Sequence, residues 1–385
     1  MVATLLLACV WAAVAIQPSS LAAQNPTLDG APVAETTLQA TTPRTYFYRG
    51  LPGSNQYMGP FDVLLNKGFN LTQAANRDRR IFQARYGTRH VLNSIFHPFE
   101  SIGNTGGWGN FLEEQILPVE AVKWVRSGFQ WDAADNMTWY PNYLGHFVEG
   151  GITSRGLAER LRAQGVPYAS ALAATTTMAA AVLNEMYTHP DLVDGTGGTV
   201  ADLYVFDLGG VLLFSLDGVA RFFSETLHAS VWPSQASLTL PDFELANNAN
   251  NLVFKIPLPF IDRASLFFRT AVGSHLGATF HLKDGYDLSV GFGADTSNQN
   301  IDPVSGRETV DLRMSSSLYL DRGGSVLASL YWSQVAHRRL SLNVYPGVIH
   351  SSFGAWLNVS RRGELSLGLT HRQALGLGLG GAIAR

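Results

Sequence analysis

Cysteine and charge are both scarce in this 385-residue chain. The single cysteine, Cys9, lies in an N-terminal apolar run, so the rest of the chain cannot form a disulfide framework. Only 15% of the residues are charged, the net charge is −3, and no basic patch is interleaved with aromatics, so nucleic acid is not an expected partner. The sequence also lacks Gly-x-Ser-x-Gly, His-Glu-x-x-His, Walker-type and Cys-x-x-Cys motifs, which leaves it without a compact catalytic signature.

Glycine and aromatic residues are plentiful, whereas mean hydropathy is close to zero. The chain has 38 glycines and 11% aromatics, with a mean hydropathy of +0.05. A multi-span helical transporter needs several apolar segments of about 20 residues each, which this average disfavours. In a transmembrane β-barrel only every second side chain faces lipid, so the average is weak. The composition therefore favours a barrel.

The N-terminus predicts export. Residues 4–16 are almost entirely apolar, Pro18 follows, and small residues lead to Ala23, so we expect a signal peptide over residues 1–23 and a final location in the cell outer membrane. No Lys or Arg precedes the apolar run, so an uncleaved anchor is an alternative. Residues 24–43 are rich in Thr, Ala and Pro and predict a flexible lead-in.

The middle of the chain contains two regions with different sequence patterns, residues 44–140 and residues 141–224. Residues 44–140 are mixed and glycine-broken, and we regard them as a source of additional barrel strands. Residues 141–224 predict a helical block with apolar segments at 168–187 and 199–223, each long enough to cross a bilayer. Because these segments carry Glu185, Asp202 and Asp207, which are costly at bilayer depth, we expect the block to pack in or against the barrel. A helical hairpin in a bilayer is the alternative.

Residues 236–385 predict barrel strands, because apolar residues there recur at every second position. Leu365, Leu367 and Leu369, for example, alternate with Ser366, Gly368 and Thr370. Nine strands fit between residues 252 and 384, with residues 264–282 forming one long strand. A closed bacterial barrel has an even number, so at least one more strand must come from upstream. The predicted lipid-facing residues are Leu288, Val290, Leu312, Leu330, Leu342 and Leu367.

The predicted fold is therefore a β membrane protein with an α insertion. It is an antiparallel transmembrane β-barrel of roughly 10–12 strands with a helical block packed in or against it. A soluble β-sandwich also alternates, but its outward face carries many charges, whereas here the second parity is Gly, Ser and Thr. On this parity His275 and His281 are expected to line the lumen rather than to catalyse.

Ionisable residues of the helical block predict one buried polar cluster, because a buried charge must find a partner. Its expected members are His146, Glu149, Arg155, Glu185, Thr199 and Asp202. We expect Arg155 to pair with Glu185, and His146 and Glu149, three apart, to share a helix face. The candidate catalytic residues are His146, Glu149, Glu185 and Asp202.

Three further expectations concern this region. Thr199 and Asp202 fit a helix capping box. Asp202 and Asp207 lie about 140° apart on an α-helical wheel and should not serve one site. We expect no metal or cofactor, because one histidine with one neighbouring carboxylate falls short of the three or four ligands of a zinc site.

The order of His146, Glu185, Thr199-Val200-Ala201-Asp202 and Gly209-Gly210 resembles an uncharacterised bacterial envelope family. This family is a domain of unknown function in which a similar helical block accompanies predicted outer-membrane barrels. More loosely, the block is similar to small VanZ-like membrane proteins. The resemblance covers residues 141–224 and departs from the family where Phe147 and Gly198 replace prolines. It implies a class of protein and no particular reaction.

Three functional hypotheses follow. The first is a barrel for envelope integrity, or for binding or passage of a small or lipidic molecule, with membrane lipid and the barrel-assembly machinery as partners. The second is an outer-membrane enzyme that modifies lipid or cell-wall precursors, with His146 as base and Glu149 or Glu185 as the carboxylate that orients it. The third is a helical inner-membrane anchor joined to a periplasmic β-domain.

Overall fold

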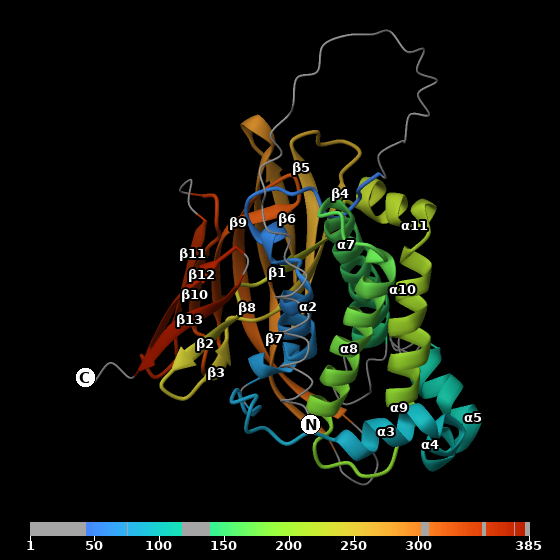
Figure 1. Cartoon of the computed structure of the whole chain (residues 1–385). Helices are drawn as coiled ribbons and strands as arrows, with labels where there is room; N and C mark the ends of the chain where they lie inside the picture. Colours follow the sequence, from blue (N-terminus) through green and yellow to red (C-terminus); the bar gives the residue numbers. More distant parts are fainter. Residues whose placement is uncertain are drawn as a thin grey trace, which may run out of the picture.

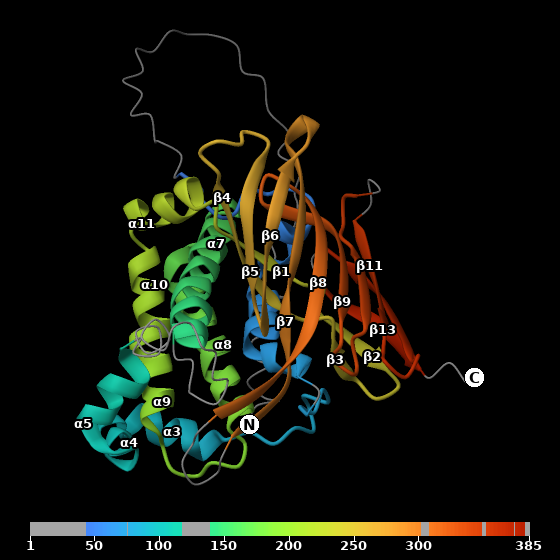
Figure 2. The same ribbon diagram turned by 180° about the vertical axis from the view of Figure 1, so that it is seen from behind.

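A computed structural model describes residues 44–74, 76–117, 139–301, 308–348, 352–372 and 374–381. The expected signal peptide (1–23) and lead-in (24–43) lie outside these residues. The described chain is a mixed α/β structure, with a helical block on one side and a large, strongly curved sheet on the other (Figures 1 and 2).

Helices occupy most of the described chain up to residue 226. In order they are η1 (Ser54–Tyr57), α2 (Pro60–Gly68), η2 (Asn70–Gln73), α3 (Thr88–Phe96), α4 (Pro98–Asn104), α5 (Gly107–Asn110), η3 (Phe111–Ile116), η4 (Trp139–Glu149), α7 (Gly150–Ala163), α8 (Ala169–Thr188), α9 (Gly197–Val200), η5 (Ala201–Asp207), α10 (Leu208–Phe214), α11 (Asp217–Arg221) and η6 (Phe222–Thr226). The described part of the 44–140 region is thus helical, and its expected contribution of strands is wrong for these residues.

Helices α7 and α8 stand side by side with α10, which continues η5, and α2 lies between them and the sheet (Figures 1 and 2). The alanine-rich sequence of α8 favours a helix, which ends before Pro190, a residue that disfavours helical conformation in the residue preceding it. Buried apolar side chains of α2, α7 and α8 form one core, which includes Leu64, Leu157 and Leu183.

The sheet contains β1 (Ser230–Pro233), β2 (Ser237–Leu240), β3 (Glu244–Ala246), β4 (Asn250–Pro257), β5 (Ala264–Thr270), β6 (Gly273–His281), β7 (Tyr286–Ile301), β8 (Glu308–Arg322), β9 (Ser325–Ser333), β10 (Leu340–Val344), β11 (Phe353–Val359), β12 (Leu365–His371) and β13 (Ala374–Gly381). From β4 to β13 each strand pairs antiparallel with the next, which confirms the predicted meander. The expected single strand over 264–282 is wrong, because β5 and β6 form a hairpin. Thr270 pairs with Ser274, and the three residues between them are an odd number that preserves the parity of the alternation, so the sequence pattern could not reveal this turn.

The sheet is not closed into a barrel, which corrects the predicted closed architecture. Its order is β1-β4-β5-β6-β7-β8-β9-β10-β11-β12-β13-β2-β3, with β13 and β2 parallel and β1 and β3 at the two ends. Three-residue connections link β1 to β2 and β3 to β4, so the chain crosses directly from one end of the sheet to the other. Helix α2 is bonded to both connections, because the Asn66 amide donates to Ser234 O and accepts from Ala249 N–H. The helix therefore joins the two ends of the sheet without strand pairing between them.

The sheet exposes its apolar side chains and buries its polar ones, which is the reverse of the arrangement in a soluble protein. Of the predicted lipid-facing residues, Leu312, Leu330, Leu342 and Leu367 are 37–43% exposed, while Leu288 and Val290 are half-buried. The opposite parity is buried although it is polar, and it includes Ser289, Asp295, Ser317, Ser329 and Thr370. Further exposed apolar residues on the outer face are Leu276, Phe280, Phe292, Met314, Trp332, Leu369, Leu377 and Leu379.

The concave side of the sheet is filled by hydrogen-bonded polar side chains of the strands and by side chains of η1. His275 is fully buried, with its two ring nitrogens 2.6 and 2.7 Å from the hydroxyls of Ser317 and Ser315. His281 is exposed near the end of β6 and contacts Asp287. Tyr57 from η1 packs inside the sheet with its hydroxyl 2.6 Å from Thr370 Oγ1. The interior is therefore a packed core of aromatics and of polar groups, most of them hydrogen-bonded.

Candidate functional site

The candidate site begins with a buried pair on two neighbouring helical segments. His146 lies on η4 and Asp207 ends η5, and Nδ1 of His146 is 2.8 Å from Oδ2 of Asp207. The Asp207 side chain is fully buried. Burial lowers the pKa of His146, but the charges of Asp207 and Asp202 outweigh it and raise the pKa to about 10. This geometry fixes the orientation of the imidazole ring.

Lys67 of α2 links this pair to Glu149. Its ammonium lies 3.2 Å from Asp207 Oδ1 and 3.4 Å from Glu149 Oε2. Glu149 also accepts hydrogen bonds from the Thr153 hydroxyl and the Asn250 amide, at 2.7 and 2.8 Å. Because Asn250 begins β4, these contacts attach the helical site to the end of the sheet where α2 is bonded.

Glu185, near the end of α8, forms the second half of the site. It accepts a hydrogen bond of 3.0 Å from the Thr199 hydroxyl, and His189 Nε2 lies 3.5 Å from the same carboxylate oxygen. His90 Nε2 lies 2.9 Å from the Thr199 hydroxyl and its ring packs on that of His189. Burial raises the pKa of Glu185, yet the hydrogen bonds and charge of His189 hold the pKa well below its usual range.

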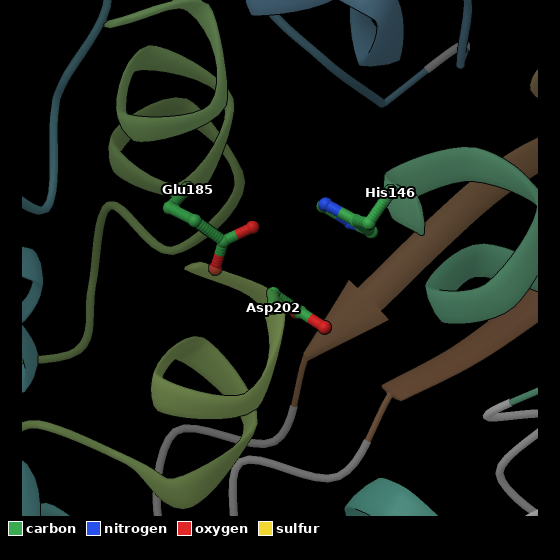
Figure 3. Close-up of side chains that lie close together, drawn as sticks. All are labelled: His146, Glu185 and Asp202. Carbon is green, nitrogen blue, oxygen red and sulfur yellow. The ribbon is translucent and has the colours of Figure 1, made fainter. Parts of the chain in front are cut away.

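The two halves meet at His146, Glu185 and Asp202. One nitrogen or carboxylate oxygen from each of these three residues lies within 4.8 Å of the others, and the side chains point toward a common space (Figure 3). We call these residues the central triad. Glu185 is buried, whereas His146 and Asp202 are partly exposed. Three of the four candidate catalytic residues thus converge, and the fourth, Glu149, joins through Lys67 and Asp207.

The structure differs from the sequence expectations at three positions. Arg155 pairs with Glu159 and Asp217 instead of Glu185, with distances of 2.9 and 2.6 Å. Thr199 does not cap a helix, since Thr196 is the N-cap of α9 and accepts from the Thr199 N–H. The Thr199 hydroxyl instead donates a hydrogen bond to Glu185.

The third difference concerns Asp202 and Asp207. An α-helical wheel places them on different faces, but η5 is a π-helix, in which residues five apart are hydrogen-bonded neighbours on successive turns. Both carboxylates therefore approach His146. The sequence did not predict Lys67, His90 and His189 as members of this site. Lys67 and His90 lie far upstream of the helical block, and His189 follows a helix whose packing partners the sequence does not reveal.

A separate polar cavity lies at one end of the sheet. It has a volume of about 210 Å³ and is lined by residues that include Arg79, Glu244, His337, Arg338 and Ser366. Burial and the nearby charges of Arg79 and Arg338 lower the pKa of His337 to about 3, so this imidazole is neutral.

The chain matches no family model, no curated protein and no solved structure. The resemblance of residues 141–224 to an envelope family therefore stays a prediction. Within the described residues, one helical stretch, Gly197–Phe214, is long and apolar enough to cross a membrane, and 56% of it is buried.

Proposed function

We propose that this chain is an integral protein of the bacterial outer membrane, with a sheet that encloses a polar interior and a helical block that holds the His146–Asp207 site. The observation that carries the proposal is the inverted polarity of the sheet. In water, the burial of apolar surface stabilises a fold by about 25 cal/mol per Å² and is the dominant favourable contribution. Here, however, the apolar side chains of successive strands face outward. A lipid environment accounts for this pattern, because hydrocarbon solvates apolar side chains and polar groups must then be satisfied internally.

The helical block supports the same placement. Tyr204, Leu208, Leu212 and Leu216 recur every four residues along η5, α10 and the turn that follows, and all are exposed. Asp207, in the same segment, is fully buried. The same segment also buries Leu203, Phe206, Val211 and Phe214, so it is apolar on both its exposed and its buried sides, whereas a surface helix in water has a polar outer side. The exposed stripe and the outer face of the sheet are therefore proposed to contact the same bilayer.

A periplasmic β-domain on a helical anchor is less well supported. Such a domain would expose its polar parity to water, whereas the exposed parity here is leucine and phenylalanine. In the proposed arrangement the chain serves the envelope by binding a small or lipidic molecule at the polar cavity at one end of the sheet.

A second candidate function is supported by the His146–Asp207 contact. A carboxylate on Nδ1 fixes the tautomer of a histidine and leaves Nε2 to exchange a proton. This arrangement suits the proposed enzyme that modifies lipid or cell-wall precursors, with Asp207 rather than Glu149 or Glu185 as the orienting carboxylate.

Cold detergent electrophoresis of the protein from separated membranes tests the membrane proposal. We expect the chain in the outer-membrane fraction, with a migration that changes on boiling, because a detergent-resistant sheet stays folded in the unheated sample. Extraction with the inner membrane, together with unchanged migration on boiling, would refute the proposal.

A further inference from the structure

We propose that His146, Glu185 and Asp202 bind one divalent transition-metal ion. Metal–ligand distances for imidazole nitrogen and carboxylate oxygen are about 2.0–2.2 Å. In the tetrahedral geometry usual for Zn²⁺, two ligand atoms of one ion are consequently separated by about 3.3–3.6 Å. The three ligand atoms of the central triad lie within 4.8 Å of one another, so side-chain rotations that move these atoms by about 1 Å complete the site.

The triad draws on three separate elements that the fold holds together. His146 belongs to η4, Glu185 to α8 and Asp202 to η5 (Figure 3). The π-helical turn of η5 is what brings Asp202 to the same side as Asp207. The site therefore depends on the tertiary structure and not on a sequence motif.

Neighbouring groups orient two of the ligands as they do in metal sites. Asp207 binds Nδ1 of His146, which leaves Nε2 as the nitrogen for an ion. Thr199 donates to Glu185, and His189 lies beside the same carboxylate oxygen. A carboxylate–histidine–metal arrangement of this kind fixes the ring and raises the basicity of the ligand nitrogen.

Charge in the cluster also favours a cation. Glu149, Glu185, Asp202 and Asp207 contribute four carboxylates and Lys67 contributes one ammonium, so the cluster has a formal excess of three negative charges once His146 gives up its proton to bind an ion. Uncompensated charge in a buried site is strongly unfavourable. A divalent ion at the central triad offsets two of these three charges.

The ligand types and their exposure indicate which ion and which role. Imidazole with carboxylates suits Zn²⁺ and Mn²⁺, whereas Ca²⁺ and Mg²⁺ prefer oxygen alone. Three protein ligands leave positions open, as in catalytic rather than structural sites. His146 and Asp202 are partly exposed, so an ion and then a small molecule with an oxygen donor can reach these positions. This inference goes beyond the proposed function and does not depend on the membrane placement.

Equilibrium dialysis of the purified full chain in detergent, after removal of metal with a chelator, tests the proposal. We expect one Zn²⁺ per chain by elemental analysis, and Co²⁺ should give visible d–d absorption with an intensity that reports its coordination number. Asp202→Asn and Glu185→Gln should each weaken Zn²⁺ binding at least tenfold. The matched control is His275→Gln, which removes another buried histidine and should bind Zn²⁺ as the unmodified chain does.

The fold is monitored in the same samples by migration on cold detergent gels and by thermal unfolding. Asp202 is partly exposed and its asparagine variant is nearly isosteric, so this variant should stay folded even if Glu185→Gln does not. Absence of saturable Zn²⁺ binding to the folded chain, or equal binding by folded Asp202→Asn, would overturn the metal site. Either result with heat-modifiable migration intact would leave the membrane proposal standing.

Discussion

Nδ1 of His146 lies 2.8 Å from Oδ2 of Asp207, although the two residues are 61 positions apart in the sequence. The contact joins η4 to η5 and places a buried carboxylate against an imidazole that also lies close to Glu185 and Asp202 (Figure 3). The chemistry of the site depends on this pair, because the ring orientation and the proton affinity of His146 both follow from it.

Asp207→Asn should lower the proton affinity of His146. Burial favours the neutral imidazole, and the largest opposing contribution is the charge of Asp207, so removing that charge should move the pKa from about 10 toward 6.5. The titration of isotopically labelled histidine, followed by NMR in detergent micelles, measures the shift. His146→Gln identifies the resonance. A pKa that is the same in Asp207→Asn and in the unmodified chain would contradict this account of the pair.

Lys67→Met should destabilise the fold strongly. Its removal leaves Glu149 and Asp207 buried without their shared cation, and breaking a buried ion pair costs roughly 3–5 kcal/mol. Chemical unfolding followed by tryptophan fluorescence gives the free energy of unfolding. The control is Arg44→Ala, which breaks an exposed pair with Glu225 and should cost no more than about 1 kcal/mol. Equal losses in the free energy of unfolding for the two variants would show that the buried ion pairs of Lys67 stabilise the fold no more than an exposed pair does.

Charge on the outer face of the sheet should be far costlier than charge in the interior cavity. Leu367→Arg places a cation against lipid and should cost about 2–4 kcal/mol near mid-bilayer. Ser366→Arg, on the opposite parity, points toward the polar cavity and should cost much less. Ser341, also on the inner parity, is an unsuitable comparison because it is only 3% exposed and packed. Similar losses of folded protein for both variants on detergent gels would mean that the outer face does not meet lipid.

Leu212→Lys distinguishes lipid from water at the helical block. The Leu212 side chain is 61% exposed on α10, so lysine there should be harmless in water but should cost about 2.5–3.5 kcal/mol at the centre of a bilayer. Val193→Lys, at an exposed position in the α8–α9 connection, is the matched control and should be neutral. The yield of folded protein in the membrane fraction reports both. A Leu212→Lys variant that folds as well as the control would exclude lipid contact at α10.

The alternation of Leu365, Leu367 and Leu369 with small residues was enough to predict the strands and the meander. Strand ends were harder, because the turn between β5 and β6 does not disturb the parity. The failure to close could not be predicted either. It depends on the short strands β1 to β3 and on Asn66 of α2, which bonds both connections between the ends of the sheet.

The candidate site was only partly predictable for a related reason. The cost of burying Glu185 and Asp202 suggested that they meet, without saying how. Lys67 gives no local sign of a distant partner, since it comes from a helix more than a hundred residues upstream of Asp207. The π-helical geometry of η5 also reverses the conclusion that an α-helical wheel gives for Asp202 and Asp207.

The most direct test of the membrane placement is the accessibility of spin labels along β8 and β9 in reconstituted vesicles. Single cysteines at Leu312, Met314, Leu318, Leu330 and Trp332 carry the label on the outer parity, and Ser317 and Ser329 carry it on the inner parity, in a Cys9→Ser background. Labels on the outer parity should be relaxed by oxygen, which concentrates in lipid, and not by a water-soluble nickel chelate. Labels on the inner parity should be protected from both reagents. Relaxation of the outer-parity labels by the nickel chelate would place that face in water and contradict the account.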